Sequence, residues 1–415
     1  MRNAAYRAAP PAVPVVYLLV PVSEREEFRP LPRGLVGWSR NRARRALDLW
    51  RWRTGGAPAP HFSTWQDAER TNRGDSAIRV ASIALLRRAF GAPARIEVVG
   101  WDELAGLDPA RVGAEAAVFV LGGGGYFGIH AGGRLAPRVG RDLAWLRRLR
   151  CPVVAFAPGV NRALEDVDRR DLDAAARATL GELAGRLGPI AVRDANTRRV
   201  LDSVAPGRAR VLADPALFLA PAGPPAPRDD TVLTVGLNLA FHGEDASRAL
   251  PARLRLVAAA ARDLARRRPC RFVYFVHEQP ERIVPALLRR EGIAARVVDA
   301  APAAMLADYA ALDLHICQML HSAILAFNAG VPTIAVAYDV KNAGLFDLMG
   351  LPEFCLSGDA PKLDAAIATA LAGGPALRHR IAARKAVLRA ETDAFLAAVV
   401  ALTTEGAGRF FRKNQ

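Results

Sequence analysis

Short apolar runs alternate along this chain with longer amphipathic stretches, and the two kinds follow one another in a regular order. Ala116–Leu121, Cys151–Ala157 and Ile190–Val192 are continuously apolar, which is typical of parallel strands buried on both faces. Asp75–Phe90 and Arg162–Leu187 carry apolar residues at helical spacing, and a Gly-Pro pair ends the second stretch. The alternation predicts an α/β domain with helices on both faces of a parallel sheet.

The second half of the chain repeats this pattern. Its expected strands are Thr231–Leu239, Arg271–Val276, Leu312–Cys317 and Thr333–Tyr338, and its expected helices include Leu250–Arg267 and Ser322–Asn328. We therefore expect two Rossmann-like domains with parallel sheets and a cleft between them. Such a pair resembles the GT-B arrangement of many glycosyltransferases.

A proline-rich segment separates the two blocks. Four prolines within the seven residues 221–227 can continue neither a helix nor a central strand, so 221–230 is predicted to be a linker. The expected organisation is a basic irregular N-terminal extension (1–60), an N-terminal Rossmann-like domain (61–220), the linker, a C-terminal Rossmann-like domain (231–400) and a tail (401–415).

The net charge of +16 favours anionic binding partners, such as phosphates, anionic lipids or nucleic acid. The basic residues are spread along the chain without a nucleic-acid-binding motif, so no nucleic-acid partner is expected. The four cysteines form no CxxC pair and lie among apolar residues, which favours free thiols in a reducing cytoplasm. No metal site and no cofactor is predicted.

The segment Arg40–Arg53 contains six arginines, and Ala43, Ala46, Leu47 and Trp50 recur at helical spacing within it. This basic amphipathic pattern fits an anionic membrane surface, and it also fits a solvated helix packed on the domain. No stretch of the chain reads as a membrane span. The expected location is the cytoplasm, with peripheral contact at the inner face of the membrane as the added possibility.

Ligands of open α/β sheets bind beyond the carboxyl ends of the strands, so the residues that carry the chemistry are expected in the loops there. Gly122–Gly125 follows a strand, and its N–H groups could contact a phosphate or serve only close packing. Arg193 could clamp an anion through two hydrogen bonds or pair with Asp194. His321 begins a helix, whose positive end disfavours the protonated imidazole and suits proton transfer near neutral pH.

Two further segments are candidates for the rim of the cleft. Asn72 and Asp75 precede or begin a helix, where they could cap the helix or contact a ligand. Asp339 and Lys341 follow the expected strand Thr333–Tyr338, which predicts both side chains on the cleft rim.

Taken in order, these segments resemble the polysaccharide pyruvyl transferase family over roughly residues 70–356. The resemblance is carried by NRGDSAIRVASIALL, VFVLGGGGYFG, PVVAFAPGVN, IAVRDANTRRVL, VLADPALFL and MLHSAILAFNAGVPTIAVAYDVKNAGLFDLMGL. It implies an enzyme that moves a pyruvyl group from phosphoenolpyruvate to a sugar of a surface polysaccharide or its lipid-linked precursor.

The resemblance also implies roles for individual residues. Arg193 is similar to the arginine of the family's Val-Arg-Asp motif, and His321 is similar to the histidine of its Arg-Leu-His motif. His321 is therefore expected to be catalytic. The donor is expected at Arg193, Gly123, Gly124, Gly125 and Lys341, and the acceptor or cleft wall at Asn72, Asp75 and Asp339.

One residue departs from the family pattern. The family usually has arginine two residues before the histidine, whereas this chain has Met319, which cannot hold a phosphate or carboxylate. Either another cation replaces it, for which Lys341 and Arg73 are candidates, or donor binding is altered or lost. The alternatives are a GT-B-type glycosyltransferase that uses a nucleotide-sugar donor, and a family member that acts in binding without catalysis.

Overall fold

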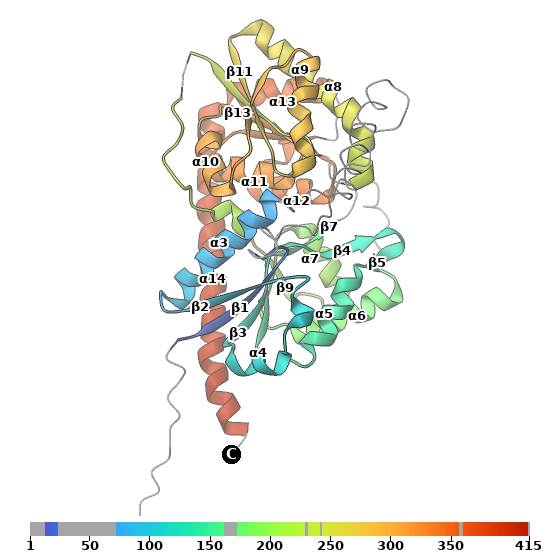
Figure 1. Cartoon of the computed structure of the whole chain (residues 1–415), viewed down its shortest axis with the longest axis vertical. Helices are drawn as coiled ribbons and strands as arrows, with labels where there is room; N and C mark the ends of the chain where they lie inside the picture. Colours follow the sequence, from blue (N-terminus) through green and yellow to red (C-terminus); the bar gives the residue numbers. More distant parts are fainter. Residues whose placement is uncertain are drawn as a thin grey trace, which may run out of the picture.

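The computed structural model describes residues 13–23, 72–161, 172–228, 231–240, 243–356 and 360–413. Within them the chain forms two six-stranded sheets whose paired strands are all parallel. The sheets lie in two lobes, one above the other in Figure 1. The expected fold class, two Rossmann-like domains in a GT-B-like arrangement, is confirmed.

The first sheet has the strand order β2-β1-β3-β6-β8-β9. Its strands are β1 (Val15–Val20), β2 (Arg95–Gly100), β3 (Val118–Leu121), β6 (Val153–Phe156), β8 (Ile190–Val192) and β9 (Ala209–Val211). Its helices are α3 (Arg73–Phe90), α4 (Pro109–Glu115), α5 (Pro137–Leu146), α6 (Ala174–Arg186) and α7 (Ala195–Asp202), followed by the 3-10 turn η5 (Pro215–Phe218). A small sheet of β4 (Gly124–His130), β5 (Arg134–Leu135) and β7 (Pro158–Asn161) lies beyond its carboxyl edge.

The second sheet has the order β12-β11-β10-β13-β14-β15. Its strands are β10 (Leu233–Leu237), β11 (Cys270–Phe275), β12 (Ala295–Val298), β13 (Leu314–Cys317), β14 (Thr333–Val336) and β15 (Cys355–Leu356). Its helices are α8 (Gly243–Arg267), α9 (Val284–Arg290), α10 (Pro302–Ala310), α11 (Leu320–Asn328), α12 (Val340–Met349), α13 (Ala360–Ala372) and α14 (Gly374–Lys413).

The chain order reverses direction at one place in each sheet. In the first sheet the reversal lies between β1 and β3, and in the second it lies between β10 and β13. Helices that leave such neighbouring strands diverge to opposite faces, which opens a crevice beyond their carboxyl ends. The Gly122–Gly125 loop follows β3, and α11 with His321 follows β13, so both belong to these crevices.

The expectation of an irregular segment over residues 1–60 is wrong for Val15–Val20. These residues form β1, which pairs with both β2 and β3 inside the first sheet. The six-residue apolar run is long enough for a buried strand, and Pro14 and Pro21 lie just outside it, where no ladder hydrogen bond is broken. The basic stretch Arg40–Arg53 lies outside the described residues.

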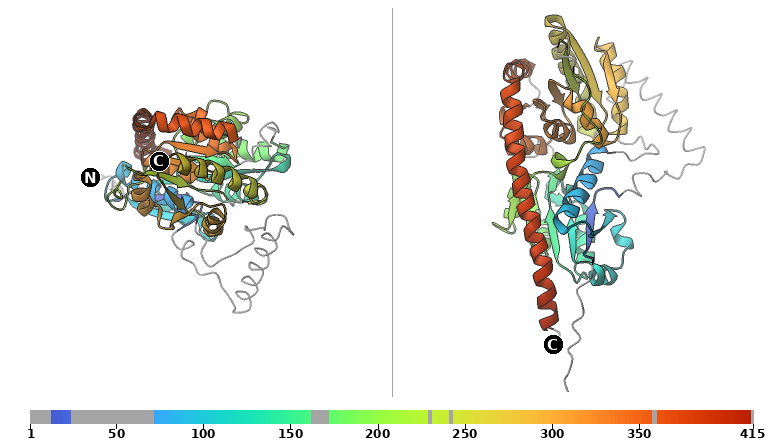
Figure 2. Two further views of the ribbon diagram at one scale, coloured as in Figure 1. Left: turned by 90° about the horizontal axis from the view of Figure 1, so that it is seen from above. Right: turned by 90° about the vertical axis from the view of Figure 1, so that its left-hand side faces the viewer.

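The C-terminal helix α14 links the two lobes. It begins in the second lobe and runs along the first, as the long red helix of Figures 1 and 2 shows. Phe395 stacks on Phe156 at a ring-centroid distance of 6.0 Å, and Leu396 and Val399 join the same core. The expected tail over 401–415 is therefore wrong as far as Lys413, because the helix continues to that residue.

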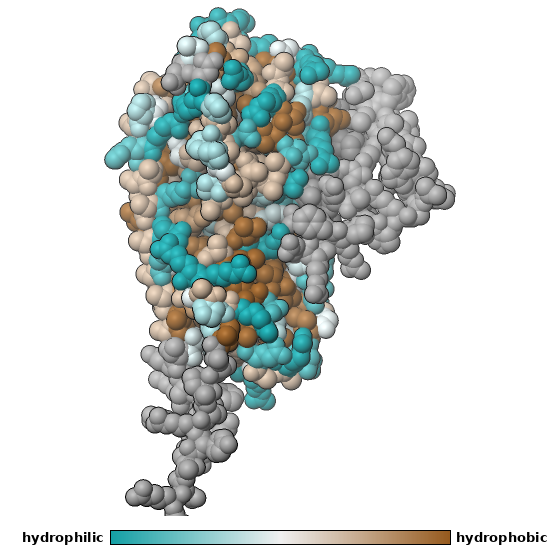
Figure 3. Space-filling view, turned by 60° about the vertical axis from the view of Figure 1, so that its left-hand side comes forward, coloured by the Kyte–Doolittle hydropathy of each residue, from teal (hydrophilic) through white to brown (hydrophobic). Residues whose placement is uncertain are grey.

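Among the described residues, no helix has the length and apolar character that a membrane crossing requires. The face shown in Figure 3 carries hydrophilic residues interspersed with hydrophobic ones.

Candidate functional site

A cavity of about 260 Å³ lies where loops from both sheets meet. The first lobe and α3 contribute Asn72, Asp75, Trp101, Gly125, Arg138, Asn161 and Arg193. The loops of the second sheet contribute Glu278, Met319, Leu320, His321, Tyr338 and Lys341. The structure thus brings together Asn72, Asp75, Gly125, Arg193, His321 and Lys341 from the expected set.

The start of α3 is attached to the second lobe, although it precedes most of the first sheet in sequence. Asn72 caps the helix by accepting hydrogen bonds from the backbone N–H groups of Gly74 and Asp75. Its side-chain amide donates to Glu278 at 3.0 Å, and the N–H of Arg73 donates to the carbonyl of His277 at 2.8 Å. Asn72 therefore caps α3 and fixes it against the loop that follows β11.

His321 lies on the first turn of α11, against the first turn of α3. A Cβ atom on Gly74 would collide with the imidazole ring, so only glycine leaves room for His321 there. The side chain of His321 is about 10% exposed, and its Nε2 atom lies 3.7 Å from Oδ2 of Asp214. The glycine of the Asn-Arg-Gly-Asp segment therefore determines where the histidine ring can lie.

A buried polar chain fixes the same turn of α11 from behind. The Ser322 hydroxyl lies 2.8 Å from the Tyr309 hydroxyl and 2.8 Å from Nε2 of His315. The Tyr309 hydroxyl also lies 2.8 Å from Nε2 of His277. Burial lowers the pKa of His315 to about 3, so this histidine is neutral at physiological pH. The chain anchors the residue next to His321 without adding charge.

Arg193 follows β8, and its guanidinium passes over Gly159 so closely that a Cβ atom there would collide with it. It donates a hydrogen bond to Oδ1 of Asn161 at 2.9 Å, and its side chain is only 4% exposed. The Nε atom lies 3.5 Å from Asp194, and Nη1 lies 3.9 Å from Asp214. Glycine at 159 thus lets a long cation reach the cavity wall from a buried strand.

Asp214 is buried between these two residues. Its Oδ1 atom accepts a hydrogen bond from the N–H of Ala216 and caps η5, while Oδ2 faces Arg193 and His321. Burial by itself would raise the pKa of the carboxyl, but His321 and then Arg193 outweigh it, and the pKa is lowered. Asp214 is a site residue that the sequence argument missed, although it lies in the quoted segment VLADPALFL.

The wall from the second lobe carries Lys341 and Met319. Burial acts to lower the pKa of Lys341, but Tyr338 and Asp339 outweigh this effect and raise it, so the amine is charged. Asp339 does not line the cavity; it caps α12 and lies 3.6 Å from the Lys341 amine. Met319 packs its sulfur 3.7 Å from the Tyr338 hydroxyl. Asp339 therefore orients the lysine.

Arg138 is a second cation that sequence reasoning did not single out. Its guanidinium stacks 3.9 Å from the ring centroid of Trp101 and donates to the carbonyl of Gly125 at 2.7 Å. Gly125 also leaves room for the Asn161 amide, which a Cβ atom would overlap. An arginine on an ordinary amphipathic helix gives no local signal in a chain so rich in arginine.

Besides Asp339, three expected or candidate residues lie outside the cavity wall. Gly123 packs against Ile78, and Gly124 adopts φ +96° beside Pro21, so both serve the turn out of β3 and neither lines the cavity. Arg73 pairs with Asp299 at 3.1 Å and is likewise absent from the cavity wall. Of the two cations proposed to replace the family arginine, Lys341 is the one at the cavity.

Several buried polar atoms around the cavity lack a hydrogen-bond partner within the described part of the chain. They are Nε of Arg193, Nε of Arg138, Oδ2 of Asp214 and Nε2 of His321. Oδ2 of Asp214 and Nε2 of His321 face each other at 3.7 Å. Arg193 and Arg138 line the cavity, and their unsatisfied buried donors are costly, which fits a site that receives an anionic ligand. In the same described ranges, no group of three or more His, Cys, Asp or Glu side chains is placed to hold a metal ion.

A family model described as polysaccharide pyruvyl transferase matches residues 58–340 of this chain, which is more than half of it. Comparison with curated protein sequences finds no significant match. Among solved structures, one named as a UDP-N-acetylglucosamine 2-epimerase from Listeria monocytogenes superposes with a TM-score of 0.51 at 10% identity, covering 75% of this chain and 88% of that one. A trehalose-phosphate synthase from Burkholderia vietnamiensis has a TM-score of 0.44 at 14% identity, covering 94% and 99%. An identity of 10% supports a shared fold and nothing finer.

Proposed function

Since the chain belongs to the polysaccharide pyruvyl transferase family, we propose that it transfers a pyruvyl group from phosphoenolpyruvate to a sugar of a surface polysaccharide or of its lipid-linked precursor. The observation that carries this proposal is the convergence of Arg193, Arg138, Lys341 and His321 on one cavity. Phosphoenolpyruvate bears a phosphate and a carboxylate, and a site for it needs several cations.

The proposed reaction forms a ketal. One sugar hydroxyl adds to the enol carbon of phosphoenolpyruvate while the methylene carbon gains a proton and becomes a methyl group. A second sugar hydroxyl then forms the other C–O bond as the C–O bond to phosphate breaks. The two hydroxyl protons balance the reaction. One accounts for the proton that the methylene carbon gains, and the other leaves with the phosphate.

In this scheme Arg193 and Lys341 bind the anionic groups of the donor from opposite lobes. Arg138 is a third cation for the donor, or for an anionic group of the acceptor. Their hydrogen bonds to phosphate or carboxylate are charge-assisted, which makes them stronger than neutral ones. Lys341 supplies the positive charge that Met319 does not, and Asn72, Asp75 and Glu278 offer polar groups to the sugar.

His321 is the proposed acid–base residue, because it is the one imidazole on the cavity wall of the described chain. Asp214 is proposed as its positioning residue. A carboxylate 3.7 Å from Nε2 favours the tautomer that carries hydrogen on that nitrogen, which leaves Nδ1 to exchange a proton with the substrate.

The direct test is incubation of the purified chain with phosphoenolpyruvate and a panel of lipid-linked sugars. Phosphate release that depends on the sugar, together with a pyruvylated product by mass spectrometry, is the expected result. Release of a nucleoside diphosphate from nucleotide sugars, with none of phosphate from phosphoenolpyruvate, would favour the glycosyltransferase alternative.

A second test examines the departure at Met319. Met319→Arg should raise the affinity for phosphoenolpyruvate if the cavity is otherwise of the family type, as measured by calorimetry. If neither the wild type nor Met319→Arg binds phosphoenolpyruvate while both remain folded, the donor assignment is wrong. A binding role without catalysis would then be the better interpretation.

We also propose a cytoplasmic location with peripheral contact at an anionic membrane surface. The free cysteines Cys151, Cys270, Cys317 and Cys355 support a reducing compartment. The basic segment Arg40–Arg53 supports the membrane contact. Binding to vesicles that contain phosphatidylserine should weaken with added salt and should fall when residues 1–60 are replaced by a neutral linker that retains Val15–Val20. Unchanged binding would contradict the membrane contact.

A further inference from the structure

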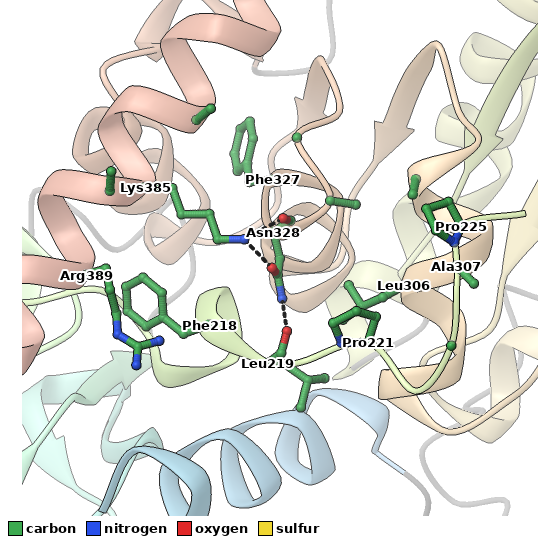
Figure 4. Close-up of a pocket in the computed structure, with 16 residues that line it drawn as sticks. Phe218, Leu219, Pro221, Pro225, Leu306, Ala307, Phe327, Asn328, Lys385 and Arg389 are labelled. Carbon is green, nitrogen blue, oxygen red and sulfur yellow. Dashed lines mark hydrogen bonds between the residues drawn. The ribbon is translucent and has the colours of Figure 1, made fainter. Parts of the chain in front are cut away.

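A second and larger cavity, of about 630 Å³, lies beside the linker between the lobes (Figure 4). Its wall is mostly apolar. The linker, η5 and their surroundings contribute Phe218, Leu219, Pro221 and Pro225, while α10 contributes Leu306, Ala307 and Ala310. The end of α11 contributes Phe327, Asn328, Ala329 and Gly330, and α14 contributes Ala382, Lys385, Ala386 and Arg389. A volume of this size suits a small organic molecule.

One end of this cavity is cationic. The amine of Lys385 donates to the backbone carbonyl of Asn328 at 2.6 Å and to its side-chain oxygen at 2.5 Å. No carboxylate forms an ion pair with Lys385 among the described residues, whereas the neighbouring Arg389 is paired with Asp393 at 3.1 Å. Burial lowers the pKa of Lys385, and Arg389 lowers it further, as expected for a charge without a counterion.

The cavity also lies at the far ends of the two elements that carry the candidate catalytic pair. Asp214 caps the start of η5, and Phe218 at its end lines the cavity. His321 lies on the first turn of α11, and Asn328 at its last position lines the cavity. The Asn328 amide donates to the carbonyls of Ala216 and Leu219 at 3.2 and 2.8 Å, so it joins the two elements, as Figure 4 shows for Leu219.

We propose that this cavity is a binding site for a small amphipathic anion, with an apolar body against Phe218, Leu306 and Phe327 and an acidic head at Lys385. The apolar wall favours burial of a hydrocarbon or aromatic body. The head supplies the counterion that Lys385 lacks within the described chain, through a charge-assisted hydrogen bond. This site goes beyond the proposed transfer reaction and does not depend on it.

The test uses two fluorescent probes that differ in charge. 8-Anilinonaphthalene-1-sulfonate is an apolar anion, and N-phenyl-1-naphthylamine is its uncharged analogue. The wild type should bind the anion more tightly than the neutral probe. Lys385→Met should weaken binding of the anion by about 10-fold or more and leave the neutral probe nearly unchanged. Lys362→Met, which changes an exposed lysine on α13, is the matched control and should alter neither.

A second variant keeps the test decisive if Lys385→Met does not fold. Ala307→Phe adds a ring at the part of the cavity wall that α10 contributes, and it should weaken the binding of both probes while Lys385 stays in place. Hydrogen exchange should also slow at residues 216–219 and 327–330 when the anion binds. Equal affinity for the two probes, or binding that neither Lys385→Met nor Ala307→Phe reduces, would overturn the proposal.

Discussion

At the scale of single residues, the charge of Asp214 should contribute to the free energy of unfolding of the protein. A carboxyl whose pKa is lower in the folded than in the unfolded state stabilises the fold at pH values above its unfolded pKa of about 3.9. This contribution is lost as the pH falls through the lower, folded value. Acid should therefore weaken the fold partly by protonating Asp214.

Asp214→Asn should remove that contribution, because the amide cannot ionise. We expect the free energy of unfolding at pH 7 to fall by about 1–3 kcal/mol, the cost of leaving a buried polar group without its partner. Stability should also depend less on pH below about pH 4 than in the wild type. Urea denaturation at pH 7 and at several acidic pH values measures both effects. Asp364→Asn, at an exposed position of α13, is the control, and an identical acid dependence in Asp214→Asn would contradict the assignment.

Substitutions of Arg193 and His321 should distinguish binding of the donor from the chemical step. Arg193→Ala removes a charge-assisted contact and should weaken phosphoenolpyruvate binding about 10- to 150-fold. His321→Ala should leave donor binding nearly intact and reduce turnover about 10²- to 10⁴-fold, the usual scale of acid–base catalysis. Calorimetry and phosphate-release kinetics distinguish the two. If His321→Ala weakens binding as much as Arg193→Ala while turnover of bound donor is unchanged, the proposed roles are wrong.

At the scale of elements, helices α3 and α11 meet where Gly74 allows the His321 ring to pack. Gly74→Ala places a methyl group in the space of the imidazole, so His321 must move although the helix itself tolerates alanine well. We expect turnover to fall at least about 10-fold, since small displacements of a catalytic group are costly. Phosphate-release kinetics and far-UV circular dichroism would show lost activity with helicity retained.

Gly140→Ala is the matched control for that experiment. Gly140 lies inside α5, and a Cβ atom there meets nothing within 4 Å. Alanine should stabilise this helix by about 0.5–1 kcal/mol and leave turnover unchanged. If Gly74→Ala behaves like Gly140→Ala, the packing of His321 against α3 does not control its position.

At the scale of the whole molecule, α14 begins in the second lobe but packs its second half on the first. Phe395→Ala removes a fully buried ring that stacks on Phe156, and should lower the free energy of unfolding by about 3–5 kcal/mol. Val387→Ala changes a residue on the same helix that is 48% exposed and should stay within about 0.5 kcal/mol of the wild type. Chemical denaturation measures both, and equal effects would mean that α14 does not hold the first lobe in solution.

The fold class and most of the strands that carry the site could be predicted from the amino-acid pattern alone. Continuous apolar runs such as Val118–Leu121 and Ile190–Val192 are typical of the interior of a parallel sheet, which is covered on both faces. The local pattern was therefore enough to predict these strands. Arg193, His321 and Lys341 were singled out because each lies in the segment after such a strand, while the expected roles of Arg193 and His321 came from the family resemblance. The cavity they share follows from the rule that ligands bind beyond the carboxyl ends of strands.

The polar residues that meet across the lobes could be identified only once the chain was folded. Asp214 and Arg138 are far from His321 in sequence, and each gave no local sign, because a capping aspartate and a helical arginine are common for reasons unrelated to ligands. The glycine loop shows the same limit. Gly125 lines the cavity, whereas Gly123 and Gly124 pack against other segments of the first lobe, and only the positions of those segments distinguish a cavity glycine from a packing glycine. Local pattern reports whether a residue is buried, whereas the partners of a buried charge come from distant segments that the fold brings into contact.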